Sequence, residues 1–408
     1  MKEKKNINRR DFLKETGGII GKTLAIPVLA GLAMGEEQKT LPSVTPTLVA
    51  PEYKIPSAEK KELVPIEKRV LGRTGMQLTA VSMGVMNCSD PAVLLHAFDL
   101  GINFFDTADC YQGGRNEEMV GNTLVGNPAV RSKIFVQTKL EVGDEKSNQD
   151  SVDRSLRRLK TDHIDSLVWH GLDTVESVND EKLISFMEKQ KKSGKARFIG
   201  FSTHSNMDKL IRAAVQNKKY DVILTVYNHT SPPALREAIK MAAEAGIGII
   251  AMKTQSGGKK KREQLSVFQH QLLLKSVLAD KNVTCAIPGV VATAQIENLA
   301  EVGRKKIEMD KNDLDSLQKL RASLRNGTCT ICGECIGDCP FGVLTKDAMR
   351  SALYLESYGN FDLAKQTLTS AFKNCPSLYC LDCSKCQVKC ARYIDIKNKI
   401  IETYQMLI

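Results

Sequence analysis

Residues 103–121, with the sequence NFFDTADCYQGGRNEEMVG, decide the fold that we expect for this chain. The apolar run at 102–105 predicts a buried strand, which ends in the acid Asp106. A polar loop carrying Tyr111 follows, and a helical pattern begins at Asn116. An acid at the carboxyl end of a buried strand is costly without a partner, so we expect a cation or a donor close to Asp106.

Two further predicted strands end in titratable groups. The strand at residues 134–138 is followed by Lys139, and the strand at 166–169 is followed by His170. In a parallel barrel the carboxyl ends of the strands meet at one mouth, where the functional residues lie. The sequence therefore predicts that Asp106, Lys139 and His170 share one site.

Strands and helices alternate from about residue 67 to residue 320. Helical patterns lie between the strands, for example at 150–159, 181–192 and 233–245. The eight expected strands lie at 78–83, 102–106, 134–138, 166–169, 197–201, 222–226, 248–252 and 285–288. Eight such units in about 250 residues predict an α/β fold, a (β/α)8 TIM barrel over residues 67–320.

Three segments resemble one known family. DTADCYQGGRNEEMVG is similar to the DTAxxYGxGxSE segment of the aldo/keto reductases, IFVQTKL to that family's lysine strand, and SLRRLKTDHIDSLVWHG to its SLxxLxxDYIDLxxxH segment. The resemblance covers roughly residues 69–304. It implies that the catalytic tetrad of the family falls on Asp106, Tyr111, Lys139 and His170.

The resemblance also implies a role for each tetrad residue. Tyr111 would be the general acid that protonates a carbonyl oxygen as hydride reaches the carbon. Lys139, held by Asp106, would lower the pKa of Tyr111, since a nearby cation favours the phenolate. His170 would orient the carbonyl or share the proton. A zinc site at His170 is not expected, because ligands at suitable sequence spacing are missing.

The same resemblance implies a nicotinamide cofactor, NAD(P)H, across the barrel mouth. No GxGxxG motif follows a first strand, which excludes a Rossmann site. Ser202 and Thr203 stand where the family holds the carboxamide. Gly289, Gln295 and Asn298 fall in the phosphate-binding segment, where Gly289 and Gln295 replace a lysine and an arginine. Their loss removes the cations that clamp a 2′-phosphate.

Nine of the twelve cysteines fall between residues 329 and 390, and eight of them form two runs with the CxxCxxCxxxC spacing of bacterial ferredoxins. The ninth, Cys375, lies outside both runs and is not expected to be a ligand. The spacing of the two runs predicts a mostly helical ferredoxin-type domain at 321–408 with two [4Fe–4S] clusters, and a helix-rich insert at 346–372. The fourth cysteine of each run is expected to reach the other cluster. The first cluster would use Cys329, Cys332, Cys335 and Cys390, and the second Cys380, Cys383, Cys386 and Cys339. A pair of zinc ribbons and a disulfide scaffold are the alternatives.

The N-terminal residues resemble a targeting segment. Residues 8–14, NRRDFLK, are similar to a twin-arginine signal, so we expect residues 1–35 to direct export of the folded protein to the periplasm or another extracytoplasmic space. A soluble basic tail is the alternative. Five prolines mark residues 36–66 as a linker. The apolar run at 19–33 is too short and broken for a stable transmembrane span.

The net charge of +11 does not indicate a nucleic-acid partner. Residues 1–35 contribute seven basic and three acidic residues, or +4 of the total. The basic run at 259–262 has no interleaved aromatic residues, so a solvated loop is expected there.

Two functions from different classes follow. The first is an exported iron–sulfur oxidoreductase that reduces small carbonyls or oxidises small alcohols, with Tyr111 as acid–base. The second is an electron-transfer protein, in which the barrel with its weakened nicotinamide site is a docking scaffold for a redox partner protein.

Overall fold

The structure is a computed structural model that describes residues 63–255, 265–324, 329–373, 375, 380 and 383–407. The predicted export segment at 1–35, residues 36–62 of the predicted linker and the basic run at 259–262 lie outside the described residues. Residues Val64–Ile408 form one compact unit. Among the described residues no helix is both long and apolar enough to cross a bilayer.

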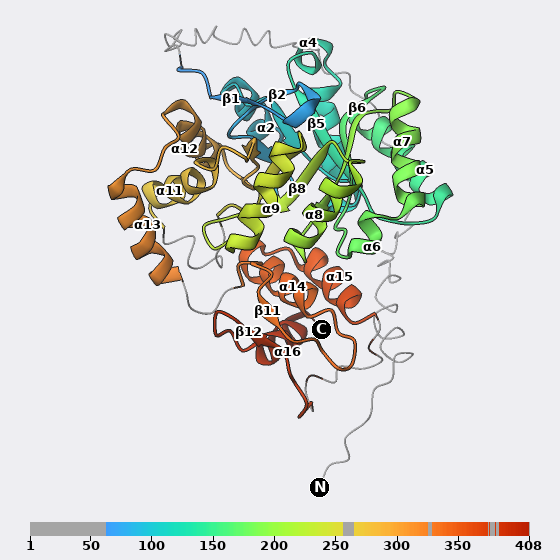
Figure 1. The fold of residues 1–408 in the computed structure, drawn as a ribbon. Coiled ribbons are helices and arrows are strands. Elements are labelled where there is room, and N and C mark those ends of the chain that lie inside the picture. The colour runs from blue at the N-terminus through green and yellow to red at the C-terminus, as the bar shows by residue number, and fades with distance from the viewer. Residues whose placement is uncertain are drawn as a thin grey trace, which may run out of the picture. The chain divides into compact units, whose positions relative to one another are not determined.

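Eight parallel strands form the central sheet, in the order of the sequence (Figure 1). They are β3 (Met83–Gly84), β4 (Phe104–Asp106), β5 (Phe135–Leu140), β6 (Ile164–Trp169), β7 (Ala196–Thr203), β8 (Val222–Val226), β9 (Gly248–Met252) and β10 (Cys285–Ala286). Parallel bridges from Val81 to Ala286 and from Gly84 to Gly289 bring the first and last strands together. The sheet is therefore a nearly closed barrel, and the predicted fold class is confirmed.

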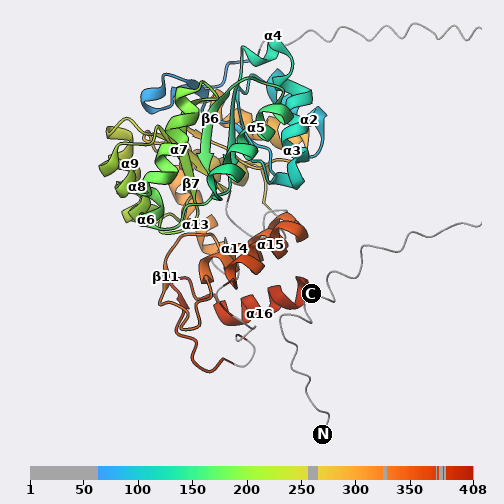
Figure 2. The ribbon, with the colours of Figure 1, turned by 90° about the vertical axis from the view of Figure 1, so that its right-hand side faces the viewer.

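Helices follow the strands and cover the outside of the barrel (Figures 1 and 2). Most helices begin at a side chain that accepts backbone N–H bonds, such as Asp144 before α5 and Asp180 before α7. They are α2 (Pro91–Asp99), α3 (Arg115–Val120), α4 (Pro128–Arg131), α5 (Glu145–Leu159), α6 (Val175–Val178), α7 (Glu181–Lys192), α8 (Met207–Asn217), α9 (Pro233–Glu244), α11 (Val267–Leu278), α12 (Thr293–Arg304) and α13 (Lys311–Leu324).

The first predicted strand, at 78–83, is wrong in detail. Its first part belongs to β2 (Gln77–Thr79), which pairs antiparallel with β1 (Lys68–Val70), and only its end belongs to barrel strand β3. The chain turns between them because the Ser82 hydroxyl donates to the Thr79 carbonyl oxygen at 2.7 Å. The β1–β2 hairpin lies against the barrel through a bond from the Arg73 N–H to the Gly246 carbonyl, 2.7 Å long.

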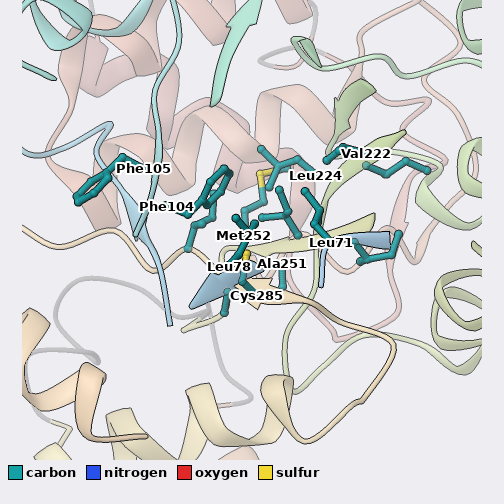
Figure 3. Packing of buried hydrophobic residues seen from close by; sticks show 14 of the residues in the cluster. Leu71, Leu78, Phe104, Phe105, Val222, Leu224, Ala251, Met252 and Cys285 are labelled. Carbon is teal, nitrogen blue, oxygen red and sulfur yellow. The ribbon is translucent and has the colours of Figure 1, made fainter. Parts of the chain in front are cut away.

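The barrel interior is filled by large apolar side chains from successive strands (Figure 3). Phe104 and Leu224 are fully buried, and the β1–β2 hairpin adds the buried side chains of Leu71 and Leu78. Full burial of each such side chain stabilises the fold by about 1.5–3 kcal/mol, because its apolar surface is removed from water. This packing fixes the strand ends that carry the candidate site.

The described residues of the C-terminal part form three helices and a short ribbon. The helices are α14 (Thr345–Tyr358), α15 (Phe361–Ala371) and α16 (Ile396–Leu407), and the ribbon pairs β11 (Cys335–Ile336) with β12 (Lys389–Cys390). The helix-rich insert expected at 346–372 thus contains α14 and α15. These helices enclose a second apolar core that includes Ala348, Met349, Leu368 and Ile400.

Residues of this part contact the barrel directly. Ile331 and Leu353 are buried in the same apolar cluster as the barrel core. The Asn228 amide donates to the Thr330 carbonyl oxygen at 3.2 Å, and the Lys346 ammonium donates to the Asn206 side-chain oxygen at 2.8 Å. The barrel mouth is therefore covered by the C-terminal part of the chain.

Candidate active site

A buried ion pair joins the ends of β4 and β5. Lys139 Nζ donates to Asp106 Oδ2 at 2.7 Å and to the Thr107 carbonyl oxygen at 2.6 Å. The second carboxylate oxygen of Asp106 accepts from Gln137 Nε2 at 2.7 Å. Burial raises the pKa of Asp106, while the Lys139 charge opposes this rise. A buried charge needs such a partner, so the prediction of a cation beside Asp106 is confirmed.

Tyr111 and His170 complete the predicted set of four. Lys139 Nζ lies 4.8 Å from the centre of the Tyr111 ring, and the rings of Tyr111 and His170 meet edge to face with centres 5.7 Å apart. The structure thus brings together Asp106, Tyr111, Lys139 and His170, which the sequence placed at three strand ends.

The expected effect of Lys139 on Tyr111 is wrong for this structure. Burial raises the pKa of Tyr111 well above its ordinary value, and the negative charge of Asp106 adds to the rise. The ammonium of Lys139 lies over the ring and already donates to Asp106 and Thr107, so the effect of burial dominates. Tyr111 is consequently a neutral phenol at physiological pH.

His170 is also neutral. Burial, followed by the positive charge of Lys139, lowers the pKa of His170 to about 3. Its Nδ1 atom lies 3.5 Å from the sulfur of Cys110. A neutral imidazole can donate from one ring nitrogen and accept at the other, which suits a residue that orients a polar substrate.

The loop that carries Tyr111 is fixed from behind by Arg158. This guanidinium donates to the Asp109 carbonyl oxygen at 3.1 Å and to Glu117 Oε2 at 3.3 Å. It passes so close to Gly114 that an added Cβ would lie 2.1 Å from the Arg158 Cζ atom, and Gly114 has a φ of 92°. Only glycine fits at this position.

A cavity of about 430 Å³ opens beside the four residues. Tyr111 and Asp106 line it from the barrel, and Tyr354 and Tyr358 of α14 line it from the C-terminal part. Lys253, which follows β9, places its ammonium 4.7 Å from the Tyr354 ring centre and 5.1 Å from that of Tyr358. The volume is within the range of small-molecule sites, about 300–1,000 Å³.

The predicted cofactor residues divide into two groups. Gly289, Gln295 and Asn298 line the cavity that Tyr111 also lines. Ser202 and Thr203 end β7, but the Ser202 hydroxyl accepts from the Gly171 N–H at 2.9 Å and the Thr203 hydroxyl donates to the Ser205 carbonyl oxygen at 2.8 Å. These two hydroxyls therefore support the local backbone.

Sequence reasoning missed three residues that line this cavity. His204 follows β7, is buried, and its Nδ1 atom has no partner among the described residues. Its position after Ser202 and Thr203 could have indicated it. Tyr354 and Tyr358 come from the cysteine-rich domain, and no motif in the sequence connects that domain with the barrel mouth.

The motif cysteines form two neighbourhoods that mix the two runs. Burial raises the pKa of Cys329 to about 12, and the nearby thiols that add to this rise belong to Cys335, Cys332 and Cys390. Burial raises the pKa of Cys380 to about 11, and the nearby thiols there belong to Cys339, Cys383, Cys386 and Cys375. The ribbon contributes by pairing Cys335 with Cys390.

This arrangement fits the expected ligand sets. Backbone N–H groups of Ile331 and Arg392 point at the sulfurs of Cys329 and Cys390 at 3.4 and 3.3 Å, as hydrogen bonds to cluster ligands do. Among the described residues no two cysteines form a disulfide, which disagrees with a disulfide scaffold. Cys329 also lines the cavity beside Tyr111, so the first cysteine group adjoins the candidate site.

Known proteins share the barrel. Residues 75–271 match the model of the aldo/keto reductase family. L-Galactose dehydrogenase from Arabidopsis thaliana is 27% identical over 311 residues, which cover 64% of this chain and 97% of that protein. Two solved aldo-keto reductases superpose with a TM-score of 0.53. The holo form from Bacillus halodurans is 24% identical over 62% of this chain and 96% of its own. The Klebsiella pneumoniae enzyme, solved with NADP and acetate, is 20% identical over 62% of this chain and 95% of its own.

The parallel barrel, the family match and the related dehydrogenases define the class of this protein, which is an oxidoreductase. Over residues 75–271 its barrel is similar to the aldo/keto reductase family.

Proposed function

We propose that the protein is an exported iron–sulfur oxidoreductase that interconverts small carbonyls and alcohols at the barrel mouth, with Tyr111 as the general acid–base. One observation carries this proposal. Tyr111 lies against the buried Lys139–Asp106 pair and next to the neutral His170, at the edge of a cavity large enough for a small substrate.

In the reduction, the carbonyl oxygen lies at the Tyr111 hydroxyl and at His170. A nicotinamide, when bound, supplies hydride to the carbonyl carbon, and Tyr111 supplies the proton to the oxygen, so that an alcohol and a tyrosinate result. Lys139, with its ammonium 4.8 Å from the ring centre, stabilises the tyrosinate that develops. A proton from solvent then restores the phenol.

The raised pKa of Tyr111 favours one direction of the reaction. Because the phenol stays protonated at neutral and alkaline pH, the proton donor for carbonyl reduction is present throughout this range. Alcohol oxidation needs the tyrosinate, so its rate rises with pH. At neutral pH the site therefore holds the proton that carbonyl reduction requires.

Gly289, Gln295 and Asn298 would hold the nicotinamide cofactor, because they line the same cavity as Tyr111. The structural relative from Klebsiella pneumoniae binds NADP, which makes this cofactor class reasonable for the present barrel. Gly289 and Gln295 carry no positive charge, so the site should not select the 2′-phosphate.

The cysteine-rich domain would hold two [4Fe–4S] clusters. The proposed ligands are Cys329, Cys332, Cys335 and Cys390 for the first, and Cys380, Cys383, Cys386 and Cys339 for the second. The two mixed thiol neighbourhoods support this assignment. Export by the twin-arginine route is part of the proposal, because that route carries proteins already folded with their clusters.

A second function is favoured by a separate observation. Cys329, a proposed cluster ligand, lines the cavity beside Tyr111, and the cofactor segment lacks its usual cations. The barrel would then be a scaffold that receives or delivers single electrons through the clusters, together with a separate redox partner protein. A nicotinamide that co-purifies with the protein would favour the first function.

The experiment uses the variants Tyr111→Phe and Lys139→Met in protein purified without oxygen. Both should lose turnover of any small aldehyde that the native protein reduces, while their iron content stays that of the native protein. Tyr393→Phe is the control, because this tyrosine in the cysteine-rich domain is 99% exposed. If both variants keep native rates, the four-residue site does not perform the reaction.

A further inference from the structure

Three metal-binding side chains converge beside the candidate active site. Cys110 lies in the loop after β4, Glu141 directly follows β5, and His170 directly follows β6. One donor atom from each of them, a sulfur, a carboxylate oxygen and an imidazole nitrogen, lies within 4.8 Å of the other two. Because these residues are distant in sequence, only the adjacency of the three strand ends brings them together.

The distance between sulfur and nitrogen suits a tetrahedral ion. Zinc binds cysteine sulfur at about 2.3 Å and histidine nitrogen at about 2.0–2.1 Å, which at a tetrahedral angle separates the two donors by about 3.6 Å. The Cys110 sulfur and His170 Nδ1 lie 3.5 Å apart. An ion could therefore enter between them without a rearrangement of the backbone.

The local charges also suit a divalent cation. The cations that act on His170 are Lys139, Arg350 and Lys253, of which Lys139 pairs with Asp106 and Arg350 with Asp347. Among the described residues no salt bridge reaches Glu141. With a thiolate, a carboxylate and a neutral imidazole as ligands, the charge of a divalent ion is balanced. Glu141 is exposed, so the ion has access from solvent.

We propose that Cys110, Glu141 and His170 form a binding site for a divalent cation of the zinc class. Thiolate and imidazole ligands select zinc-like ions over Mg²⁺ or Ca²⁺, which prefer oxygen ligands. Three protein ligands leave the fourth tetrahedral position for water. This proposal departs from the expectation that no zinc site lies at His170, because the three ligands are adjacent in space and follow no linear spacing.

Occupation of this site would inhibit carbonyl reduction. This consequence rests on the proposed function, in which His170 contacts the substrate. The ion takes His170 Nδ1 and fixes the ring, whose edge-to-face contact with Tyr111 places it at the reacting group. Inhibition should be reversed by a chelator.

The first measurement is zinc content, and it does not depend on activity. Holoprotein with both clusters is equilibrated with Zn²⁺ without oxygen, freed of excess ion, and analysed for zinc and iron. The native protein should hold one more equivalent of zinc than Cys110→Ser or Glu141→Gln. Removal of a ligand should weaken binding at least tenfold, since loss of a mere outer-shell partner already costs about 10–100-fold. Equal zinc in native protein and both variants, at equal iron, overturns the proposal.

Cys88→Ser is the matched control. Cys88 is a buried cysteine whose carbonyl oxygen accepts from Gln112 Nε2, next to Tyr111, at 3.1 Å, but its sulfur contacts the Asp90 carbonyl oxygen instead of a histidine. It should bind zinc as the native protein does. A second measurement uses Co²⁺ in place of Zn²⁺, in protein whose clusters are oxidised. The paramagnetic spectrum of the bound Co²⁺ should show a thiolate ligand that disappears in Cys110→Ser. An unchanged spectrum in this variant contradicts the site. One equivalent of site-specific zinc without inhibition supports the metal site and contradicts the proposed role of His170.

Discussion

Replacement of Lys139 by methionine tests the electrostatics of the candidate site. Methionine has a similar length and leaves no large cavity, but it removes an ammonium that donates to Asp106 at 2.7 Å and to Thr107 at 2.6 Å. Each hydrogen bond to a charged group contributes about 1.5–3 kcal/mol, and the loss of one partner of a buried pair costs about 3–5 kcal/mol. We therefore expect the free energy of unfolding to fall by about 3–5 kcal/mol.

The loss of stability in Lys139→Met should depend on pH. Burial already raises the pKa of Asp106 in the native protein, and Lys139 is the largest opposing influence. Without the lysine this pKa rises further, so the folded variant retains a proton that the unfolded chain releases. Stability that depends on such a raised pKa is present at low pH and is lost as the pH rises through the folded value. The free energy of unfolding of Lys139→Met should thus fall further below that of the native protein at about pH 8 than at about pH 5.

The assay is chemical unfolding followed by tryptophan fluorescence. Trp169 is the single tryptophan, lies in β6 and is fully buried, so it reports on the barrel alone. Lys195→Met is the control, because Lys195 and its partner Asp153 are 34% and 39% exposed and such pairs contribute at most about 1 kcal/mol. A deficit in Lys139→Met no larger than that of the control, or one that shrinks as pH rises, would refute this account of the pair.

Three further predictions concern the cofactors. Protein purified without oxygen should contain about eight irons and eight acid-labile sulfides, and Cys375→Ser should not change this count; four irons, or zinc in their place, would contradict two clusters. Binding of a nicotinamide should not favour the 2′-phosphate, because each missing charge-assisted contact costs about 1.5–3 kcal/mol; a titration with NADPH at least tenfold tighter than NADH would disprove this. Excess NADH or NADPH should not bleach the cluster absorbance without a mediator, since hydride carries two electrons and a cluster accepts one; bleaching at the rate of carbonyl turnover would show direct transfer.

The barrel could be predicted because its signals are local. Each strand is a short apolar run between polar turns, and Asp106, Lys139 and His170 follow such runs directly. Parallel strands then bring their ends to one mouth, whatever the intervening helices contain. The prediction of one strand at 78–83 was wrong because a side-chain hydrogen bond of Ser82 creates a turn within an apolar run. Hydrophobic periodicity does not detect such a turn.

The surroundings of the site depend on contacts that sequence patterns do not encode. The cover that Tyr354 provides arises from the docking of α14 on the mouth, and the neighbours of Cys110 come from two other strands. The direction of the Tyr111 pKa was mispredicted for the same reason. The sequence indicates a lysine nearby, whereas the degree of burial and the position of the ammonium over the ring decide which effect dominates.

Transfer of deuterium tests the central claim most directly. Native protein is incubated without oxygen with nicotinamide deuterated at the reactive carbon, on either face, and with a set of small aldehydes, and the alcohols are analysed by mass spectrometry. The account predicts one deuterium on the former carbonyl carbon with native protein and none with Tyr111→Phe at equal iron content. Alcohol that forms without deuterium, and only when a one-electron donor is added, would contradict hydride chemistry in this barrel and support the electron-transfer function.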